Sequence, residues 1–271
     1  MIGGALAFPF LLLRRKPVTV LLCLLISVVL GVAIDFADMR LSTLNGVTEV
    51  QDYYVWRQVA YYLLRTAALG APAALVLTQA VIVLGRRDAD RKFNPLDAVR
   101  FIGVALLYVL VFVLPLTVLN FYLIRWFTAS VMYLSPLLSL GQFVVGMLIL
   151  CLFALVWSDV IARERFALFH TLKVTGRRYW RVLGIVGPLV IITVLVDWGA
   201  RWGGWFAYTL LPQSLMQAMS DDPASTSPYW LTNVATAEIG QVFSTYLLSV
   251  GNAYLYSRLM PERPERVAEM F

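Results

Sequence analysis

The sequence predicts an all-α protein, a polytopic bundle of membrane-spanning helices. The first observation is composition: 60% of the 271 residues are hydrophobic and 14% are charged, whereas soluble domains carry about 25% charged residues. The second is a mean hydropathy of +0.76, and the third is a series of uncharged runs bounded by charges. A soluble core of this size cannot hide so much apolar surface. The composition therefore excludes a soluble enzyme, a disordered chain and a fibrous repeat.

Six segments are predicted to cross the bilayer, because a span needs about 20 apolar residues. The spans are expected at about 17–34, 66–85, 101–122, 137–157, 180–198 and 239–257. The uncharged run of the fifth is short, so we expect that helix to extend at both ends, with Asp197 and Arg201 forming an interfacial pair. No connection is long enough for a second domain, so residues 1–271 are expected to form one integral membrane domain.

The basic residues predict the orientation. With both termini in the cytoplasm, 17 of the 22 Lys and Arg residues fall on the inner side, as the positive-inside rule requires. This orientation explains the net charge of +6, so the charge does not indicate a nucleic acid partner. We expect a multi-pass protein of the bacterial inner (plasma) membrane, with its N-terminal span uncleaved.

Three further segments are expected at the membrane surface. Residues 1–13 are apolar and lead to a basic cluster. Residues 52–65 are rich in aromatic side chains, which favours an interfacial helix that runs into the second span. The uncharged stretch 202–220 either lies flat in the headgroup layer or re-enters the bilayer around Gly203 and Gly204.

The inner loop 159–181 is predicted to form a basic amphipathic helix on the cytoplasmic membrane surface. Such a helix can bind anionic lipid headgroups, and the alternative is a positive-inside anchor with no further role. The candidate anionic-lipid surface consists of Arg163, Arg165, Lys173, Arg177, Arg178 and Arg181.

A polar stripe follows the last predicted span. Its members recur three or four residues apart and so share one helical face: Glu238, Gln241, Thr245, Ser249 and Asn252. Polar side chains in a span face the bundle or a wet cavity, so we expect Leu247 and Tyr254 to be more exposed than the stripe. Two interpretations stay open: a polar groove for a substrate, or interhelical hydrogen bonds that stabilise the bundle. Glu238, near the predicted outer end, is expected to contact water.

The inner loop and the chain's last helix end also carry a resemblance. The residues concerned are Glu164, Ala167, Leu172, Thr175, Gly176, Arg177, Tyr179, Trp180, Arg181 and Leu183, with the run 253–259. They resemble a bacterial family of membrane domains found with some glycerophosphoryl diester phosphodiesterases, together with related uncharacterised six-helix proteins. The resemblance implies a six-helix membrane domain without the catalytic barrel, and it transfers no catalytic residue.

Chemistry-bearing residues are scarce. The chain has one histidine, His170, and two cysteines, Cys23 and Cys151. These are too few residues to favour a catalytic triad or a His/Cys metal site. Neither Gly-Gly pair continues into a phosphate-binding loop. We expect no cofactor and a non-enzymatic protein that acts through membrane partners, a homo-oligomer or envelope organisation. The alternative is a small transporter or lipid-handling protein that uses the polar stripe.

Overall fold

The structure is a computed structural model, and it describes residues 2–44, 51–87, 93–119, 135–166, 168–210, 212, 214 and 228–260. Nearly all of these residues are helical, and none of them lies in a strand. The helices are α1 (Ile2–Arg15), α2 (Pro17–Leu44), α3 (Gln51–Val83), α4 (Pro95–Tyr108) with a π-helical turn η1 (Val109–Val113), α6 (Ser135–Phe153), α7 (Val156–Arg163), α8 (Leu168–Arg177), α9 (Tyr179–Thr209) and α11 (Pro228–Leu259). The all-α prediction is confirmed for this part of the chain.

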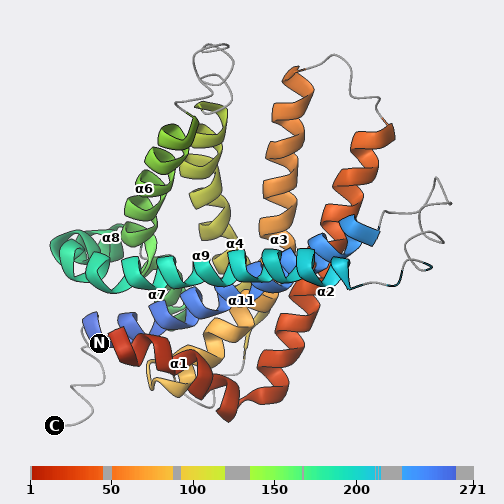
Figure 1. The fold of residues 1–271 in the computed structure, drawn as a ribbon. Coiled ribbons are helices and arrows are strands. Elements are labelled where there is room, and N and C mark those ends of the chain that lie inside the picture. Colours follow the sequence, from red (N-terminus) through yellow and green to blue (C-terminus); the bar gives the residue numbers. More distant parts are fainter. Residues whose placement is uncertain are drawn as a thin grey trace, which may run out of the picture.

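The long helices form two crossing groups. The segments α2, α3, α4 and α6 stand roughly upright beside one another, and α9 and α11 run across them as a closely packed pair (Figure 1). Helix α1 lies against α11 and contacts α2. Helix α11 therefore lies at the centre of the molecule, in contact with α1, α2, α3, α7 and α9.

Five helices are long and apolar enough to cross a membrane, and they correspond in order to the first five predicted spans. Their bounds are Pro17–Asp38, Arg57–Val83, Pro95–Leu119, Phe143–Arg163 and Tyr179–Thr209. Helix α11 is not among them, because the polar stripe lowers its hydropathy. A helix enclosed by other helices can carry polar residues that a lipid-facing helix cannot. The sixth span and the N-in/C-in orientation remain predictions.

Several predicted boundaries differ from the structure. The aromatic stretch 52–65 does continue directly into the second predicted span, as expected, because α3 runs without a break from Gln51 to Val83; its place at the membrane surface remains a prediction. Helix α9 continues through Gly203 and Gly204 to Thr209, so no re-entrant turn forms at the glycines; residues 215–220 lie outside the described part of the chain. The predicted surface segment 1–13 forms α1 with Ala5 and Leu12 buried. It is therefore packed against the bundle.

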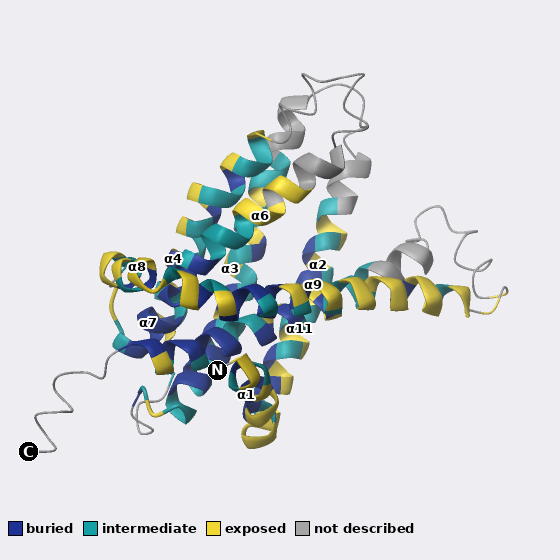
Figure 2. Ribbon diagram, turned by 60° about the vertical axis from the view of Figure 1, so that its left-hand side comes forward, coloured by how far each residue is buried: buried dark blue, intermediate teal, exposed yellow. Residues whose placement is uncertain are grey.

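Burial is concentrated where the two groups of helices cross. The buried residues of α1, α3, α7, α9 and α11 share one hydrophobic cluster, and Tyr246 of α11 donates a hydrogen bond from its buried hydroxyl to the Pro9 carbonyl (2.6 Å). By contrast, the C-terminal half of α9 extends beyond this core with mostly exposed side chains (Figure 2). Trp198, Trp202 and Trp205 lie on this extension. Their exposure fits a segment that meets lipid or another protein.

Candidate functional site

A buried cluster of charges joins α2, α3 and α11. The guanidinium of Arg65 donates to the Asp35 carboxylate at 2.9 Å and to the Glu238 carboxylate at 2.5 Å. The same guanidinium donates to the hydroxyl of Tyr61 and to the side-chain oxygen of Gln241, both at 2.7 Å. The side chains of Arg65 and Glu238 are only 8% and 2% exposed. Buried charges within membrane-spanning helices mark candidate functional sites.

The expectation that Glu238 contacts water is wrong, and the sequence reasoning missed its partners. Asp35 and Arg65 were interpreted as charges that end the first and second spans. Instead α2 and α3 continue past them, so both lie well inside their helices. One signal could have found the cluster: Asp35, Arg65 and Glu238 all bound predicted spans on the same side of the membrane. Charges of opposite sign at one membrane level are candidates for pairing.

The cluster has one unusual feature at Glu238. Its Oε2 is buried without a hydrogen-bond partner among the described residues. The atom lies against Gly31 of α2, where any Cβ would overlap it. Gly31 is therefore required for the close approach of α2 and α11 at the charge cluster.

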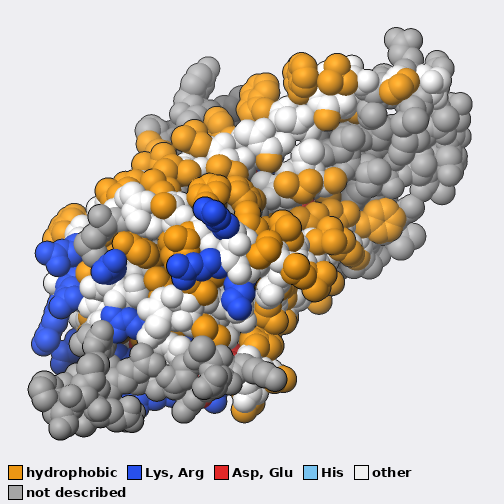
Figure 3. Space-filling model, turned by 90° about the horizontal axis from the view of Figure 1, so that it is seen from below, with side chains coloured by type: hydrophobic (Ala, Val, Ile, Leu, Met, Phe, Trp, Pro, Cys, Tyr) orange, Lys and Arg blue, Asp and Glu red, His pale blue; other side chains and the backbone are white. Residues whose placement is uncertain are grey.

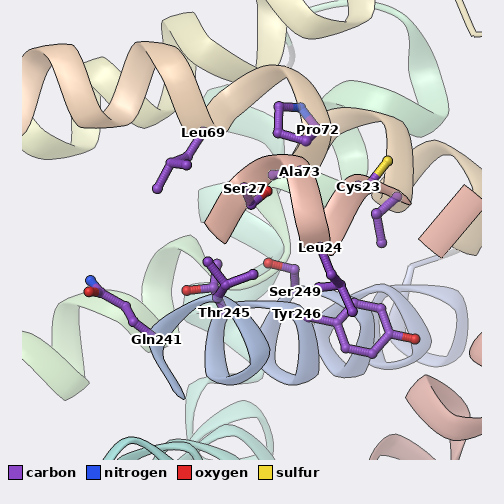
Figure 4. A pocket seen from close by; sticks show the side chains of 12 residues that line it. Cys23, Leu24, Ser27, Leu69, Pro72, Ala73, Gln241, Thr245, Tyr246 and Ser249 are labelled. Carbon is purple, nitrogen blue, oxygen red and sulfur yellow. The ribbon is translucent and has the colours of Figure 1, made fainter. Parts of the chain in front are cut away.

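An open groove lies between α2, α3 and α11, next to this cluster. Figure 4 shows Gln241, Thr245 and Ser249 of α11 on one side of it, with Ser27, Leu69, Pro72 and Ala73 opposite. The remaining lining residues are Cys23, Leu24, Val76, Val242 and Tyr246. One part of the wall thus offers hydroxyl and amide groups, and the rest is apolar.

The five residues of the polar stripe have three different environments. Gln241 and Thr245 are exposed to the groove and Ser249 is half-buried in its wall. Glu238 belongs to the charge cluster, and Asn252 is buried with its Oδ1 unpaired in the described part of the structure. The expectation that Leu247 is more exposed than the stripe is wrong: it is 5% exposed. The opposite side of α11 packs against α9, where Ser244 donates to the Thr193 carbonyl at 2.8 Å.

Gln241 connects the charge cluster to the groove. Since guanidinium groups can only donate hydrogen bonds, the contact with Arg65 fixes the Gln241 amide with its oxygen toward the cluster. Because the oxygen faces Arg65, the NH₂ group of Gln241, which lines the groove, can donate only to a group other than Arg65. Its orientation is a consequence of the tertiary contact, because Arg65 lies 176 residues away in the chain.

At the opposite end of α11, a second buried network holds the predicted inner loop. Asp159 of α7 accepts from the hydroxyls of Thr171 on α8 (2.5 Å) and Tyr256 on α11 (2.8 Å). Its carboxylate also pairs with Arg163 at 2.7 Å. Arg178 is bonded to the Leu259 carbonyl. Two of the six candidate lipid-binding residues, Arg163 and Arg178, therefore make structural contacts.

The other four basic residues of that surface are exposed: Arg165, Lys173, Arg177 and Arg181. Seen from below, Lys and Arg side chains gather on one face with apolar side chains between them (Figure 3). Phe169 and Trp180, on the same segment, are 86% and 80% exposed. Exposed aromatic and basic side chains together are typical of a segment at a membrane surface. His170 is exposed as well.

No group of histidine, cysteine and acidic residues suited to a metal ion occurs within the described ranges. No family model, curated protein or solved structure matches the chain. The class of protein therefore rests on the fold: the described residues are nearly all helical and include five helices able to span a membrane. The resemblance to the phosphodiesterase-associated membrane domains remains a prediction.

Proposed function

We propose that this protein binds a lipid-like amphiphile in the groove between α2, α3 and α11 and handles it within the membrane. The observation that carries this proposal is the two-sided lining of the groove, which is apolar on α2 and α3 except for the hydroxyl of Ser27 and carries polar groups at Gln241, Thr245 and Ser249 of α11. An amphiphile matches such a lining, because its hydrocarbon part packs on the apolar wall while its polar part reaches the hydroxyls. The proposal is the lipid-handling alternative of the sequence analysis.

The energetics of the membrane support an occupant. Gln241 and Thr245 are exposed, and a polar group without a hydrogen-bond partner in hydrocarbon costs several kcal/mol. An amphiphile or water in the groove would satisfy these groups.

The groove contains no pairing of a nucleophile with a base, so the proposed role is binding or transfer without covalent chemistry. We further propose the topology given by the basic residues: six spans, both termini in the cytoplasm, and the bacterial inner membrane as location. In that orientation the exposed cations of the α8 region face the inner leaflet, where anionic lipids attract them. The charge cluster then lies toward the outer leaflet.

A role through membrane partners is the second candidate. The observation that favours it is the exposed extension of α9, with Trp198, Trp202 and Trp205 outside the core. A partner helix or a second copy would cover these side chains. Proximity labelling of the intact protein in its membrane, with identification of the labelled proteins, tests this role.

The groove proposal is tested by blocking the groove. Thr245→Phe places an aromatic ring in the groove, and Ile239→Phe places the same ring at an exposed position of α11 that does not line the groove. The protein is extracted in polymer nanodiscs, washed in mild detergent, and its retained lipids are quantified by mass spectrometry. We expect Thr245→Phe to lose a retained species that wild type and Ile239→Phe keep. Equal lipid content in all three would contradict the proposal.

A further inference from the structure

The groove is free of formal charge. All twelve lining residues are uncharged: Cys23, Leu24, Ser27, Leu69, Pro72, Ala73, Val76, Gln241, Val242, Thr245, Tyr246 and Ser249. A charged headgroup placed there would lose its hydration without gaining a counter-ion, and an unpaired charge in an apolar environment is costly. The lining therefore disfavours ligands with an ionised headgroup.

The polar wall is rich in hydrogen-bond donors. Gln241 presents its NH₂ group, because its oxygen already accepts from Arg65. Thr245, Ser249 and Ser27 add hydroxyls, which both donate and accept, whereas the Tyr246 hydroxyl is already bonded to Pro9. The Gln241 NH₂ group can donate to an acceptor oxygen of an occupant. The wall suits a polar group with acceptor oxygens, such as ester carbonyls or hydroxyls.

The adjoining charge cluster disfavours an anionic headgroup, and the groove lining offers nothing to pair with a cationic one. Asp35 and Glu238 share the single guanidinium of Arg65, so an anionic headgroup at this end of the groove would meet two carboxylates and no available cation. A cationic headgroup would find no carboxylate in the lining. The unpaired Oε2 of Glu238 lies against Gly31, which does not line the groove.

We infer that the occupant of the groove is an uncharged amphiphile whose polar part carries ester or hydroxyl oxygens, of the diacylglycerol type, and not an anionic phospholipid. This inference rests on the proposed function and specifies its ligand class. It assigns a positioning role to Arg65, which orients Gln241 without touching the ligand.

Two cysteines provide the readout in the unmodified chain. Both cysteines are buried, but Cys23 lines the groove and is 6% exposed, whereas Cys151 is 0% exposed and does not line it. The purified full-length protein in detergent is titrated with dioleoylglycerol or with dioleoylphosphatidic acid, which has the same acyl chains and an added phosphate. Alkylation by N-ethylmaleimide is then followed at each cysteine by peptide mass spectrometry. Cys151 serves as the internal control for unfolding.

We expect dioleoylglycerol to protect Cys23 at a concentration at least about tenfold lower than dioleoylphosphatidic acid, equivalent to 1.4 kcal/mol. Thr245→Arg, which adds a cation to the polar wall, should reverse that preference. Thr245→Phe should abolish protection by either lipid.

The contrary outcomes separate the two levels of the proposal. If the anionic lipid protects Cys23 as well as the neutral one, and Thr245→Phe abolishes both effects, the groove binds lipid but the ligand class inferred here is wrong. If neither lipid protects Cys23, or Thr245→Phe leaves protection intact, the groove proposal itself fails.

Discussion

The buried pairing of Arg65 gives the sharpest test of the structure. Arg65→Met keeps a side chain of similar length but leaves the carboxylates of Asp35 and Glu238 in one low-dielectric site without their cation. Wild-type Arg65 is only 8% exposed and donates to four side chains within 2.9 Å. Removing one partner of such a buried pair costs about 3–5 kcal/mol. With ~2–4 °C per kcal/mol for a chain of this size, the midpoint of thermal unfolding should fall by about 10 °C.

Arg201→Met is the matched control. Arg201 also pairs with an acid, Asp197, at 3.0 Å, but the arginine side chain is 54% exposed, and an exposed pair contributes about 0–1 kcal/mol. The sequence analysis predicted this pair, and the structure confirms it. Thermal unfolding in detergent, followed by fluorescence-detected size-exclusion chromatography, compares the two variants.

The double variant Arg65→Met, Glu238→Met provides a second check. Replacing both members of a buried pair by apolar residues is often neutral, so the double variant should recover part of the stability lost in Arg65→Met. The structural interpretation of the cluster is refuted if Arg65→Met unfolds within about 2 °C of Arg201→Met. In that case Arg65 would be hydrated and not enclosed between α2, α3 and α11.

Four other features give further predictions. Gly240→Ala should destabilise the protein by about 1–3 kcal/mol, because the new Cβ would lie 2.5 Å from that of Ala200. Its control, Gly199→Ala, has open space around it and should be neutral or slightly stabilising. Equal thermal midpoints of the two variants would contradict the α9–α11 packing. Tyr256→Phe removes a hydrogen bond to the buried Asp159 carboxylate and should lower the free energy of unfolding by about 1.5–3 kcal/mol. The same unfolding assay measures this change. An unchanged stability would show that the hydroxyl is not bonded there. Lys173→Glu should weaken retention of phosphatidylglycerol in native mass spectrometry, because each exposed basic residue contributes about 1 kcal/mol at an anionic surface. Salt screens this attraction. Unchanged retention would leave the α8 cations as anchors only. A reporter fused in the connection between α3 and α4 should give a cytoplasmic signal, and an external signal would overturn the orientation.

Local sequence was sufficient to predict the helical class and the membrane setting. Both features can be read from single segments, because each apolar segment is transferred from water to lipid independently of the others. The first five predicted spans each correspond to a helix able to cross a bilayer. Boundaries were less predictable, because a charge ends a span only if it stays in water. Asp35 and Arg65 do not end their helices, since each neutralises the other inside the protein.

The candidate site was predictable in part. The 3–4 spacing of Gln241, Thr245 and Ser249 indicated a common face, and these three do line the groove. The same spacing could not separate them from Glu238 and Asn252, which are buried, nor predict that Leu247 is enclosed. Periodicity gives the direction of a side chain from its own helix but carries no information on which neighbours surround that helix.

The sequence by itself determined that the chain is helical and apolar enough for a membrane, because hydrophobic solvation acts on each segment separately. Only the tertiary structure decided that α9 and α11 cross the other helices, that Arg65 joins Asp35 to Glu238, and that a groove remains beside them. The contact of Arg65 with Glu238 joins residues 173 positions apart in the chain. Such contacts depend on how complete helices pack, and small residues such as Gly31 and Gly240 decide how closely they approach.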